Sequence, residues 1–255
     1  MHQNNKTMIA ILSPAKKLNE KVSFPEHLDY TEPVFKEKAE KLVAYLRQLT
    51  PEEIAVLMGI SDKLARLNYE RFQQWTAEGR YPAVYLYAGD TYRGLDIASF
   101  PLEKINNLQK KVRIISGLYG ILRPLDLIMP YRLEMKTPLK INGYEDLKGY
   151  WKDDVTAFLR NELKGKPLVN LASKEYAEVI DKEKLDAPFI QVDFKEYKDG
   201  KYKIIGLLAK RARGAMARWM AENDVENPED LKAFNLGGYR FAPEMSTENH
   251  LVFIR

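Results

Sequence analysis

The chain has 255 residues, enough for one large domain or two small ones, and 45% of them are hydrophobic, so a sizeable core is possible. The formal net charge is only +4, so the total charge alone does not indicate a polyanionic partner. Cysteine is absent, which excludes disulfides, thiolate metal sites and cysteine nucleophiles. No segment has the roughly 20 apolar residues of a membrane span, and the N-terminal MHQNNKT does not resemble a signal peptide. We therefore expect a cytoplasmic protein without a membrane partner.

Hydrophobic periodicity and turn residues predict strands and helices that are interleaved irregularly along the chain. The expected strands are residues 8–12, 83–88, 112–115, 167–171, 189–197, 201–209 and 250–254. The expected helices are residues 33–48, 51–58, 62–75, 101–110, 151–163, 210–222 and 228–234. A long loop is expected over 117–142. Asp199-Gly200 predicts a β-hairpin, because a type I′ turn requires positive φ angles.

This arrangement favours a single α/β (mixed α+β) domain with a mixed sheet over a doubly wound Rossmann sheet. The sequence contains neither a G-x-G-x-x-G nor a Walker-type loop, which weakens the dinucleotide-binding and NTPase interpretations. We expect one domain over residues 8–255, preceded by a disordered leader over residues 1–7.

The loop after the third predicted strand is the first candidate for phosphate binding, because ligands of α/β sheets favour the carboxyl ends of strands. Ser116 and Gly117 would present free backbone N–H groups, and Arg123 and Arg132 each offer a bidentate fork. Between residues 104 and 140 there are eight Lys or Arg and two Asp or Glu. The alternative is a structural turn with solvated arginines.

A second candidate is the start of the helix predicted over 210–222, where Lys210, Arg211 and Arg213 follow a predicted strand. Positive charge near a helix N-terminus is unfavourable against the helix dipole, and a bound anion would relieve it. The alternative is an ordinary basic surface helix whose apolar side chains face the core.

A third candidate is the turn between the helices predicted to end at Met58 and to begin after Ser61. Gly59, Ser61 and Lys63 give it the form of a helix-hairpin-helix element, in which backbone N–H groups meet a DNA phosphate. The usual pattern has a second glycine where this chain has Ser61. A plain corner between two helices, with Gly59 as its C-cap, is the alternative.

Other polar residues also follow predicted strands. Lys16 comes shortly after the first strand, and Ser173 and Lys174 follow the strand predicted over 167–171. One shared basic cleft would explain these positions together with those above. Coincidence would also explain them, because loops are polar.

The candidates for general acid–base catalysis are the carboxylates Asp90, Asp126 and Glu134 and the phenols Tyr92 and Tyr131. The alternative for each carboxylate is a partner for a neighbouring arginine or a turn residue. The three histidines lie far apart and form no ligand motif, so we expect neither a metal nor a cofactor.

Six segments occur in an order that resembles the YaaA-type peroxide-stress proteins of bacteria. They are SPAKKL at 13–18, GISDKLA at 59–65, AGDTYRGL at 88–95, SGLYGILRPLDLIMPYRLEM at 116–135, VNLASKEY at 169–176 and AKRARGAMARWM at 209–220. The resemblance implies a cytosolic protein that protects against hydrogen peroxide and limits free intracellular iron. It also implies an unusual α/β fold with a positively charged cleft and a helix-hairpin-helix element associated with double-stranded DNA.

By this resemblance the expected partner is double-stranded DNA or another phosphate-bearing ligand, bound by a monomer without an established enzymatic activity. The residues that fall in the matching hairpin or basic motifs are Gly59, Ser61, Lys63, Lys16, Arg123, Arg132, Lys174, Lys210, Arg211 and Arg213. Two alternatives stay open. One is an enzyme with glycosidic or phosphoryl chemistry on a nucleotide or nucleic-acid base, and the other is direct sequestration of iron by carboxylates.

Overall fold

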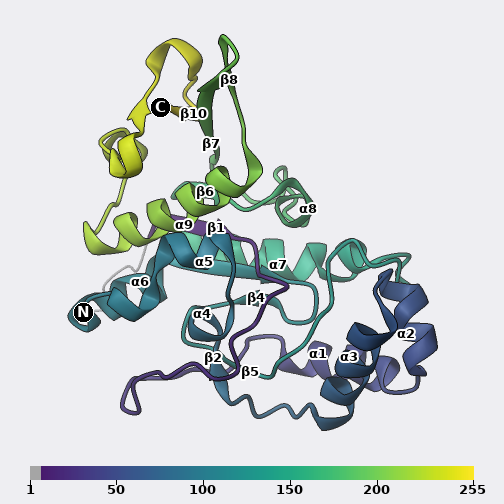
Figure 1. Ribbon diagram of the computed structural model, residues 1–255. Helices are drawn as coiled ribbons and strands as arrows, with labels where there is room; N and C mark the ends of the chain where they lie inside the picture. Colours follow the sequence, from purple (N-terminus) through teal and green to yellow (C-terminus); the bar gives the residue numbers. More distant parts are fainter. Residues whose placement is uncertain (1–6) are drawn as a thin grey trace.

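The computed structural model describes residues 7–255, and a mostly parallel mixed β-sheet runs through it (Figure 1). The strand order is β4-β3-β1-β6-β7-β10-β9, with β8 paired to β7. The bounds of these strands are β1 Ile9–Leu12, β3 Val112–Ser116, β4 Gly120–Leu122, β6 Leu168–Leu171, β7 Phe189–Lys198, β8 Lys201–Lys203, β9 Arg240–Phe241 and β10 His250–Ile254. Strands β3, β1, β6, β7 and β10 are parallel, whereas β4, β8 and β9 pair antiparallel.

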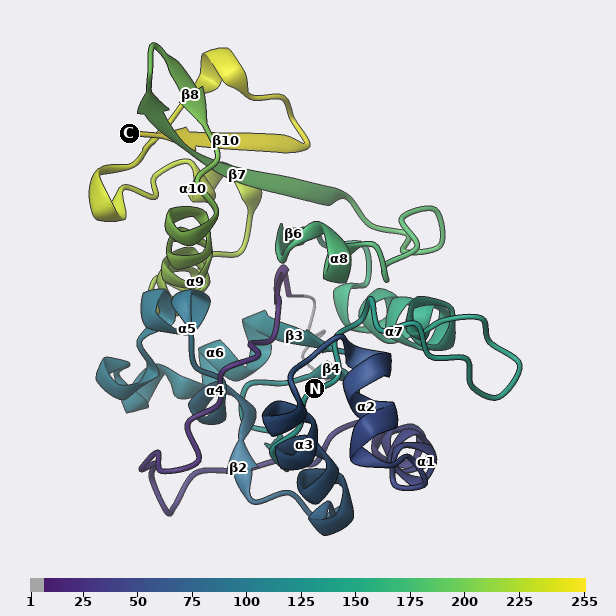
Figure 2. The ribbon, with the colours of Figure 1, turned by 45° about the vertical axis from the view of Figure 1, so that its right-hand side comes forward.

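Helices surround this sheet, and a second small sheet pairs β2, Tyr81–Pro82, with β5, Leu127–Ile128. The helices are α1 Lys36–Leu46, α2 Pro51–Met58, α3 Asp62–Gln74, α4 Ala83–Leu86, α5 Asp90–Leu95, α6 Ile105–Lys111, α7 Leu147–Leu163, α8 Lys174–Ala177, α9 Gly206–Glu222 and α10 Pro228–Leu231. Short 3-10 turns occupy Ile97–Ser99, Leu102–Lys104, Leu236–Gly238 and Pro243–Met245. Figure 2 shows α5 and α9 on one side of β1 and α7 on the other, with α1, α2 and α3 at the end away from the β7–β10 strands.

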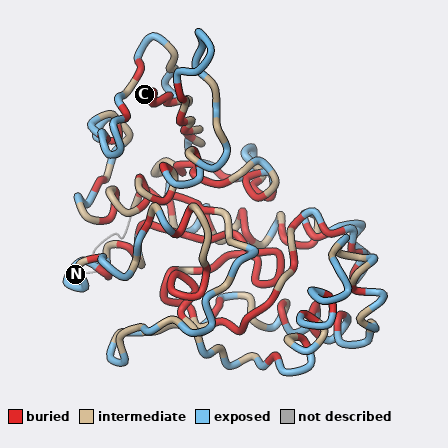
Figure 3. Tube along the Cα trace, viewed as in Figure 1, coloured by how far each residue is buried: buried red, intermediate tan, exposed pale blue. Residues whose placement is uncertain are grey.

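The sheet is the centre of the hydrophobic core. Strands β1 and β3 are buried along their whole length, as the continuous buried trace through the middle of Figure 3 shows. Parallel strands covered on both faces read as continuous apolar runs, which is why MIAIL was recognisable as a strand. Among residues 7–255, no helix is both long and apolar enough to cross a membrane.

The mixed α/β fold predicted from the sequence is confirmed, but three elements differ. The strand expected over 83–88 is the short helix α4, because the backbone N–H groups of Ala83 and Val84 donate to the carbonyls of Asp126 and Pro124 instead of to a strand. The loop expected over 117–142 contains the strands β4 and β5. The strand expected to reach residue 209 ends at Lys203, and α9 begins at Gly206. The leader predicted over residues 1–7 lies outside the described residues, except for Thr7.

The turn between α2 and α3 forms as its sequence predicts. Thr50 and Glu53 make a capping box at the start of α2, and Gly59 ends that helix in the left-handed conformation with φ 62°. The Ser61 hydroxyl then accepts a hydrogen bond from the Leu64 amide, 3.3 Å away, and caps α3. Two helices therefore meet at a tight, capped turn.

Helices α5 and α9 cross in unusually close contact. A Cβ atom added at Gly214 in α9 would lie 1.7 Å from the Thr91 carbonyl oxygen of α5. A Cβ atom added at Gly94 in α5 would lie 1.9 Å from the Arg211 carbonyl oxygen of α9. Only glycine fits at both positions, so the two backbones are held in one fixed relation.

Candidate functional site

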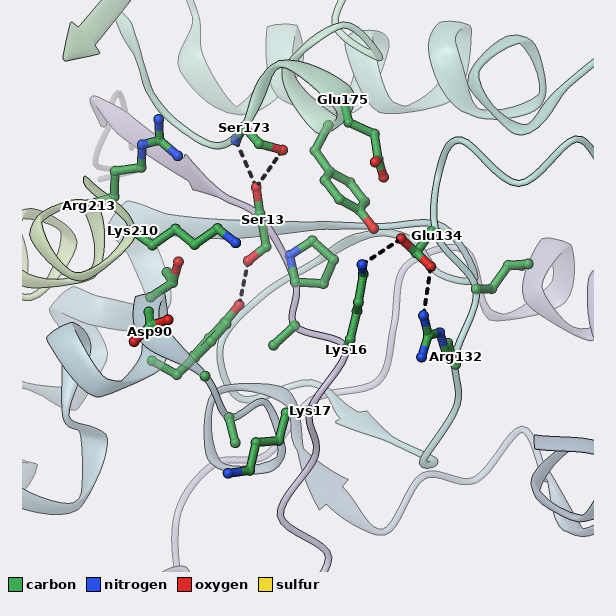
Figure 4. A pocket seen from close by; sticks show the side chains of 18 of the residues that line it. Ser13, Lys16, Lys17, Asp90, Arg132, Glu134, Ser173, Glu175, Lys210 and Arg213 are labelled. Carbon is green, nitrogen blue, oxygen red and sulfur yellow. Dashed lines mark hydrogen bonds and ion pairs between the residues drawn. The ribbon is translucent and has the colours of Figure 1, made fainter. Parts of the chain in front are cut away.

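A cavity of about 340 Å³ opens at the carboxyl ends of β1 and β6, where parallel sheets commonly bind ligands. Five segments that are far apart in the sequence form its wall (Figure 4). They are the loop after β1, the start of α5, the segment after β5, the α8 region and the second turn of α9. The lining residues include Ser13, Lys16, Asp90, Tyr92, Tyr131, Arg132, Glu134, Ser173, Glu175, Tyr176, Lys210 and Arg213.

Two serines join the strand ends at the floor of the cavity. The pairing of β1 with β6 ends at Leu12 and Leu171, so the residues that follow each strand lie beside one another. The Ser173 amide donates to the Ser13 hydroxyl at 2.8 Å, and that hydroxyl donates to the Ser173 hydroxyl at 3.2 Å. The Tyr92 hydroxyl donates to the Ser13 carbonyl at 2.8 Å, which ties α5 to the same point.

Glu134 is the centre of an ion-pair cluster on one wall, with its side chain only 11% exposed. Its carboxylate lies 3.2 Å from the Lys16 ammonium, 3.2 Å from the Arg132 guanidinium and 3.7 Å from the Lys136 ammonium. Burial raises the pKa of Glu134, but hydrogen bonds and charge from Lys16 and Arg132 outweigh it and lower the pKa overall. Glu134 is therefore ionised, and its carboxylate holds the three basic side chains together.

Replacing Glu134 with Gln is expected to make the unfolding temperature depend less on pH in the acidic range. The pKa of Glu134 is lower in the folded state than in the unfolded state. Its ionised form therefore stabilises the fold above the unfolded-state pKa, and this stabilisation is lost as pH falls through the folded-state pKa. Thermal unfolding from pH 3 to pH 7 should show the wild type and Glu134→Gln converging at the acidic end. Glu145→Gln, which removes an exposed carboxylate, is the control; parallel curves for wild type and Glu134→Gln would contradict the expectation.

The tyrosines of the cavity wall are held by buried hydrogen bonds. The Tyr131 hydroxyl lies 2.5 Å from the Tyr87 hydroxyl and 2.6 Å from the Ser116 hydroxyl. Burial raises the pKa of Tyr131 to about 12 and also raises the pKa of Tyr92. Both phenols are therefore neutral at physiological pH and act as hydrogen-bond donors and aromatic wall.

Helix α9 contributes two cations. Lys210 is exposed at the mouth, whereas Arg213 is partly buried, and burial lowers its pKa although the Asp193 carboxylate opposes this effect. Within residues 7–255 the structure records no hydrogen bond or ion pair for the Arg213 guanidinium, and Figure 4 draws none for either side chain. Opposite them, the Glu175 Oε2 atom is buried without a partner.

Eight of the predicted site residues line this one cavity. They are Lys16, Asp90, Tyr92, Tyr131, Arg132, Glu134, Lys210 and Arg213. All three carboxylates weighed for acid–base chemistry pair with an arginine: Asp90 with Arg211 at 3.1 Å, Asp126 with Arg123 at 3.0 Å, and Glu134 with Arg132. Each carboxylate therefore makes the contact expected under the alternative, in which it is the partner of a neighbouring arginine.

Ser116 and Gly117, whose backbone N–H groups were expected to be free for a ligand, are buried and lie outside the cavity lining. Ser116 is fully buried, and its hydroxyl accepts a hydrogen bond from the Tyr119 amide in addition to contacting Tyr131. The Gly117 carbonyl accepts from the Trp151 indole at 2.8 Å, and a Cβ atom at Gly117 would lie 2.1 Å from the Leu133 carbonyl oxygen. These two residues pack the loop and do not face the cavity.

Arg123 and Asp126 also lie away from the cavity lining. Asp126 is fully buried, and burial raises its pKa even though the Arg123 guanidinium and the Thr31 hydroxyl lower it. Arg123 donates in turn to the Glu32 carbonyl at 2.6 Å. The pair fastens the loop after β4 to the segment before α1, so the proposed catalytic role for Asp126 is not supported by its position.

The prediction that Lys210, Arg211 and Arg213 lie at the N-terminus of a helix is wrong. Helix α9 begins at Gly206, a full turn earlier than expected, and the helix dipole acts mainly within the first turn. Arg211 is exposed and pairs with Asp90 beside the cavity mouth. What brings Lys210 and Arg213 to the cavity is the crossing of α5 and α9.

The remaining predicted residues lie elsewhere. Gly59, Ser61 and Lys63 form the exposed α2–α3 turn and are outside the cavity lining. Lys174 lines a second cavity of about 810 Å³, in which Asn170, Gln191 and Asp193 are linked by hydrogen bonds and which shares Arg213 with the first. The basic segments therefore converge only in part.

Sequence reasoning missed two cavity residues, Ser13 and Glu175, and it singled out Glu134 and Ser173 without placing them in one site. The position after a strand was the available signal for both serines, since strand ends meet at one edge of a parallel sheet. No signal pointed to Glu175. Within residues 7–255, no three His, Asp or Glu side chains are grouped so that they could hold a metal ion.

Comparison with known proteins extends the resemblance to almost the whole chain. A family model described as peroxide stress protein YaaA matches residues 8–245. A UPF0246 protein of Flavobacterium johnsoniae is 48% identical over 253 residues, covering 97% of this chain and 100% of that protein. UPF0246 proteins of Idiomarina loihiensis and Polynucleobacter asymbioticus are each 46% identical over 255 residues, covering 97% of this chain and 98% of each relative. The chain therefore belongs to the YaaA family of peroxide stress proteins.

Proposed function

We propose that this protein acts in the cytoplasm under peroxide stress by binding double-stranded DNA through its phosphate backbone, without sequence specificity. In this way it helps to limit free iron and oxidative damage to DNA. The observation that carries the proposal is the α2–α3 turn, with Gly59 in the left-handed conformation and Ser61 as N-cap. Family membership supplies the peroxide-stress setting.

The start of α3 has the groups that a backbone phosphate requires. Lys63 is exposed there, and the structure records no hydrogen-bond acceptor within residues 7–255 for the amides of Asp62 and Lys63. Unpaired amides at a helix N-terminus, together with the helix dipole, favour an anion. Such contacts position a protein on DNA but carry no sequence information, which fits recognition of the backbone alone.

Lys63→Met is expected to weaken binding to duplex DNA alike for different sequences. Losing one phosphate contact should reduce the slope of log K against log salt by about 0.9. An anisotropy titration over a salt series with two unrelated duplexes measures both quantities. Lys201→Met removes the same charge from the β-hairpin at the opposite end of the molecule and is the control (Figure 1). Absence of binding at low salt, or a sequence-selective loss, would refute this proposal.

A second candidate function is an enzyme acting on a nucleotide or a nucleic-acid base. The cavity favours it, because carboxylates and cations converge there beside two serine hydroxyls at strand ends. Carboxylates assist glycosidic or phosphoryl chemistry as acids or bases, and cations stabilise developing negative charge. Asp90 is the carboxylate at the mouth, 23% exposed and held by Arg211.

Asp90→Asn is expected to abolish turnover while sparing ligand binding, since it keeps the size of the side chain and removes its charge and basicity. A screen of nucleotides and of duplexes with damaged bases, followed by product analysis, gives the measurement. Asp153→Asn, which changes an exposed carboxylate on α7, is the control. No turnover of any compound by the wild type would count against this candidate and leave the DNA-binding proposal standing.

A further inference from the structure

The cavity is lined by polar groups that the protein itself leaves unpaired. The Glu175 Oε2 atom and the Arg132 Nε atom are both buried without a hydrogen-bond partner, and no partner is recorded for Arg213 within residues 7–255. A buried polar atom without a hydrogen-bond partner costs free energy, so its persistence requires an explanation. A ligand that supplies the missing partners is such an explanation.

Two of these groups, Glu175 and Arg213, have opposite charge and lie on opposite sides of the cavity. Figure 4 shows Lys210 and Arg213 on one side of Ser13 and Glu175 on the other. Glu134 lies near Glu175, but Lys16, Arg132 and Lys136 already occupy its carboxylate. Glu175 is therefore the acceptor left for a ligand, and α9 supplies the cations.

The size and the wall of the cavity narrow the ligand further. A volume of about 340 Å³ is at the lower end of the range for small-molecule sites and is far too small for a duplex. Tyr92, Tyr131 and Tyr176 contribute aromatic surface, and burial keeps their phenols neutral by raising their pKa values. An aromatic ligand with an anion at one end and a hydrogen-bond donor at the other matches this lining.

We propose that the cavity binds an aminopurine nucleoside monophosphate, with its phosphate on Lys210 and Arg213 and an N–H donor of its base on Glu175. The proposal rests on the second candidate function above, because both require a phosphate-bearing ligand in this cavity. It adds the chemical feature that the site selects, which is an N–H group on the base. Charge-assisted hydrogen bonds to a carboxylate are stronger than neutral ones, so the selection is measurable.

Calorimetric titration of the full chain with AMP and with purine riboside 5′-monophosphate tests this selection. The two compounds differ only in the exocyclic amine, and the second has no N–H donor on its base. AMP is expected to bind at least about tenfold more tightly, as the loss of one hydrogen bond to a charged group predicts. Inorganic phosphate serves as the probe for the anion site alone.

Glu175→Met removes both acceptor oxygens at similar side-chain length and is expected to abolish the preference for AMP. The variant should unfold at the same or a higher temperature than the wild type, because a buried oxygen without a hydrogen-bond partner is removed. Glu178→Met is the matched control: it replaces a glutamate three residues further on, which is half exposed and paired with Lys174. It should retain the preference.

Four results would overturn the inference, and they separate it from the function on which it rests. If AMP, purine riboside monophosphate and phosphate all fail to bind, both the proposed ligand and the second candidate function are refuted. Equal affinity for the two nucleotides would refute only the proposed selection for an N–H donor on the base. A preference that survives in Glu175→Met would show that another group selects the amine. A marked drop in the unfolding temperature of this variant would show that Glu175 is a structural residue.

Discussion

Gly214→Ala is expected to destabilise the fold by about 3 kcal/mol, which lowers Tm by roughly 6–12 °C for a chain of this size. The added Cβ would lie 1.7 Å from the Thr91 carbonyl oxygen, a backbone atom that has no rotamer by which to move away. The helices α5 and α9 must therefore separate. Because α5 carries Asp90 and Tyr92 and α9 carries Lys210 and Arg213, the cavity opens as well, and ligand affinity falls together with stability.

Gly206→Ala provides the control for this experiment. It makes the same change in the same helix at a position where the added Cβ has no heavy atom within 4 Å. Alanine is a better helix former than glycine, so Gly206→Ala should be neutral or stabilising by up to about 1 kcal/mol. Chemical denaturation of both variants measures the contrast. Equal destabilisation by the two substitutions would show that close packing at Gly214 is not the cause.

The double substitution Lys210→Met and Arg213→Met is expected to lower the affinity of the cavity for a phosphate ligand at least about 100-fold. Each lost charge-assisted hydrogen bond removes about 1.5–3 kcal/mol of binding free energy. The side chains keep most of their apolar length, and Arg213 has no recorded partner in the described chain to leave unpaired, so stability should change little. Calorimetry with AMP and thermal unfolding of the same samples separate the two effects.

The control for the double variant is Lys198→Met with Lys201→Met, at the tip of the β7–β8 hairpin. These lysines are exposed and lie outside both cavities, so the pair removes the same net charge without touching the site. An equal loss of affinity in the control would mean that the protein attracts the ligand by its overall field. Wild-type affinity in the cavity variant would place the phosphate elsewhere.

Where a structural signal is local, the sequence is sufficient to predict it. The capping box at Thr50, the left-handed Gly59 and the Ser61 cap are all set by residues within a few positions of one another. The Asp199-Gly200 turn joins β7 and β8 with φ angles of 53° and 79°, as a two-residue hairpin loop requires. Each of these elements is specified by residues that lie close together in the sequence.

Where the deciding contact is distant, the same reasoning fails. The apolar run at 83–88 has strand-like composition, but distant carbonyls at Pro124 and Asp126 take its hydrogen bonds, and it becomes helix α4. Glu175 has no distinguishing neighbours in the sequence, and only the pairing of β1 with β6 brings the α8 region to the cavity. The site is therefore less predictable than the elements that carry it.

The central position of β1 has a consequence for biosynthesis. Its partners are β3 and β6, so Ile9 meets Leu168 across a sequence separation of more than 150 residues. At about 5–20 residues per second, a ribosome needs roughly 8–30 s to make that intervening chain. Until β3 has been made, the apolar segment MIAIL has no strand to pair with, and its other edge lacks β6 for the whole interval. A nascent chain in this state exposes apolar surface that chaperones can bind. Slow translation would lengthen the time during which this surface can aggregate.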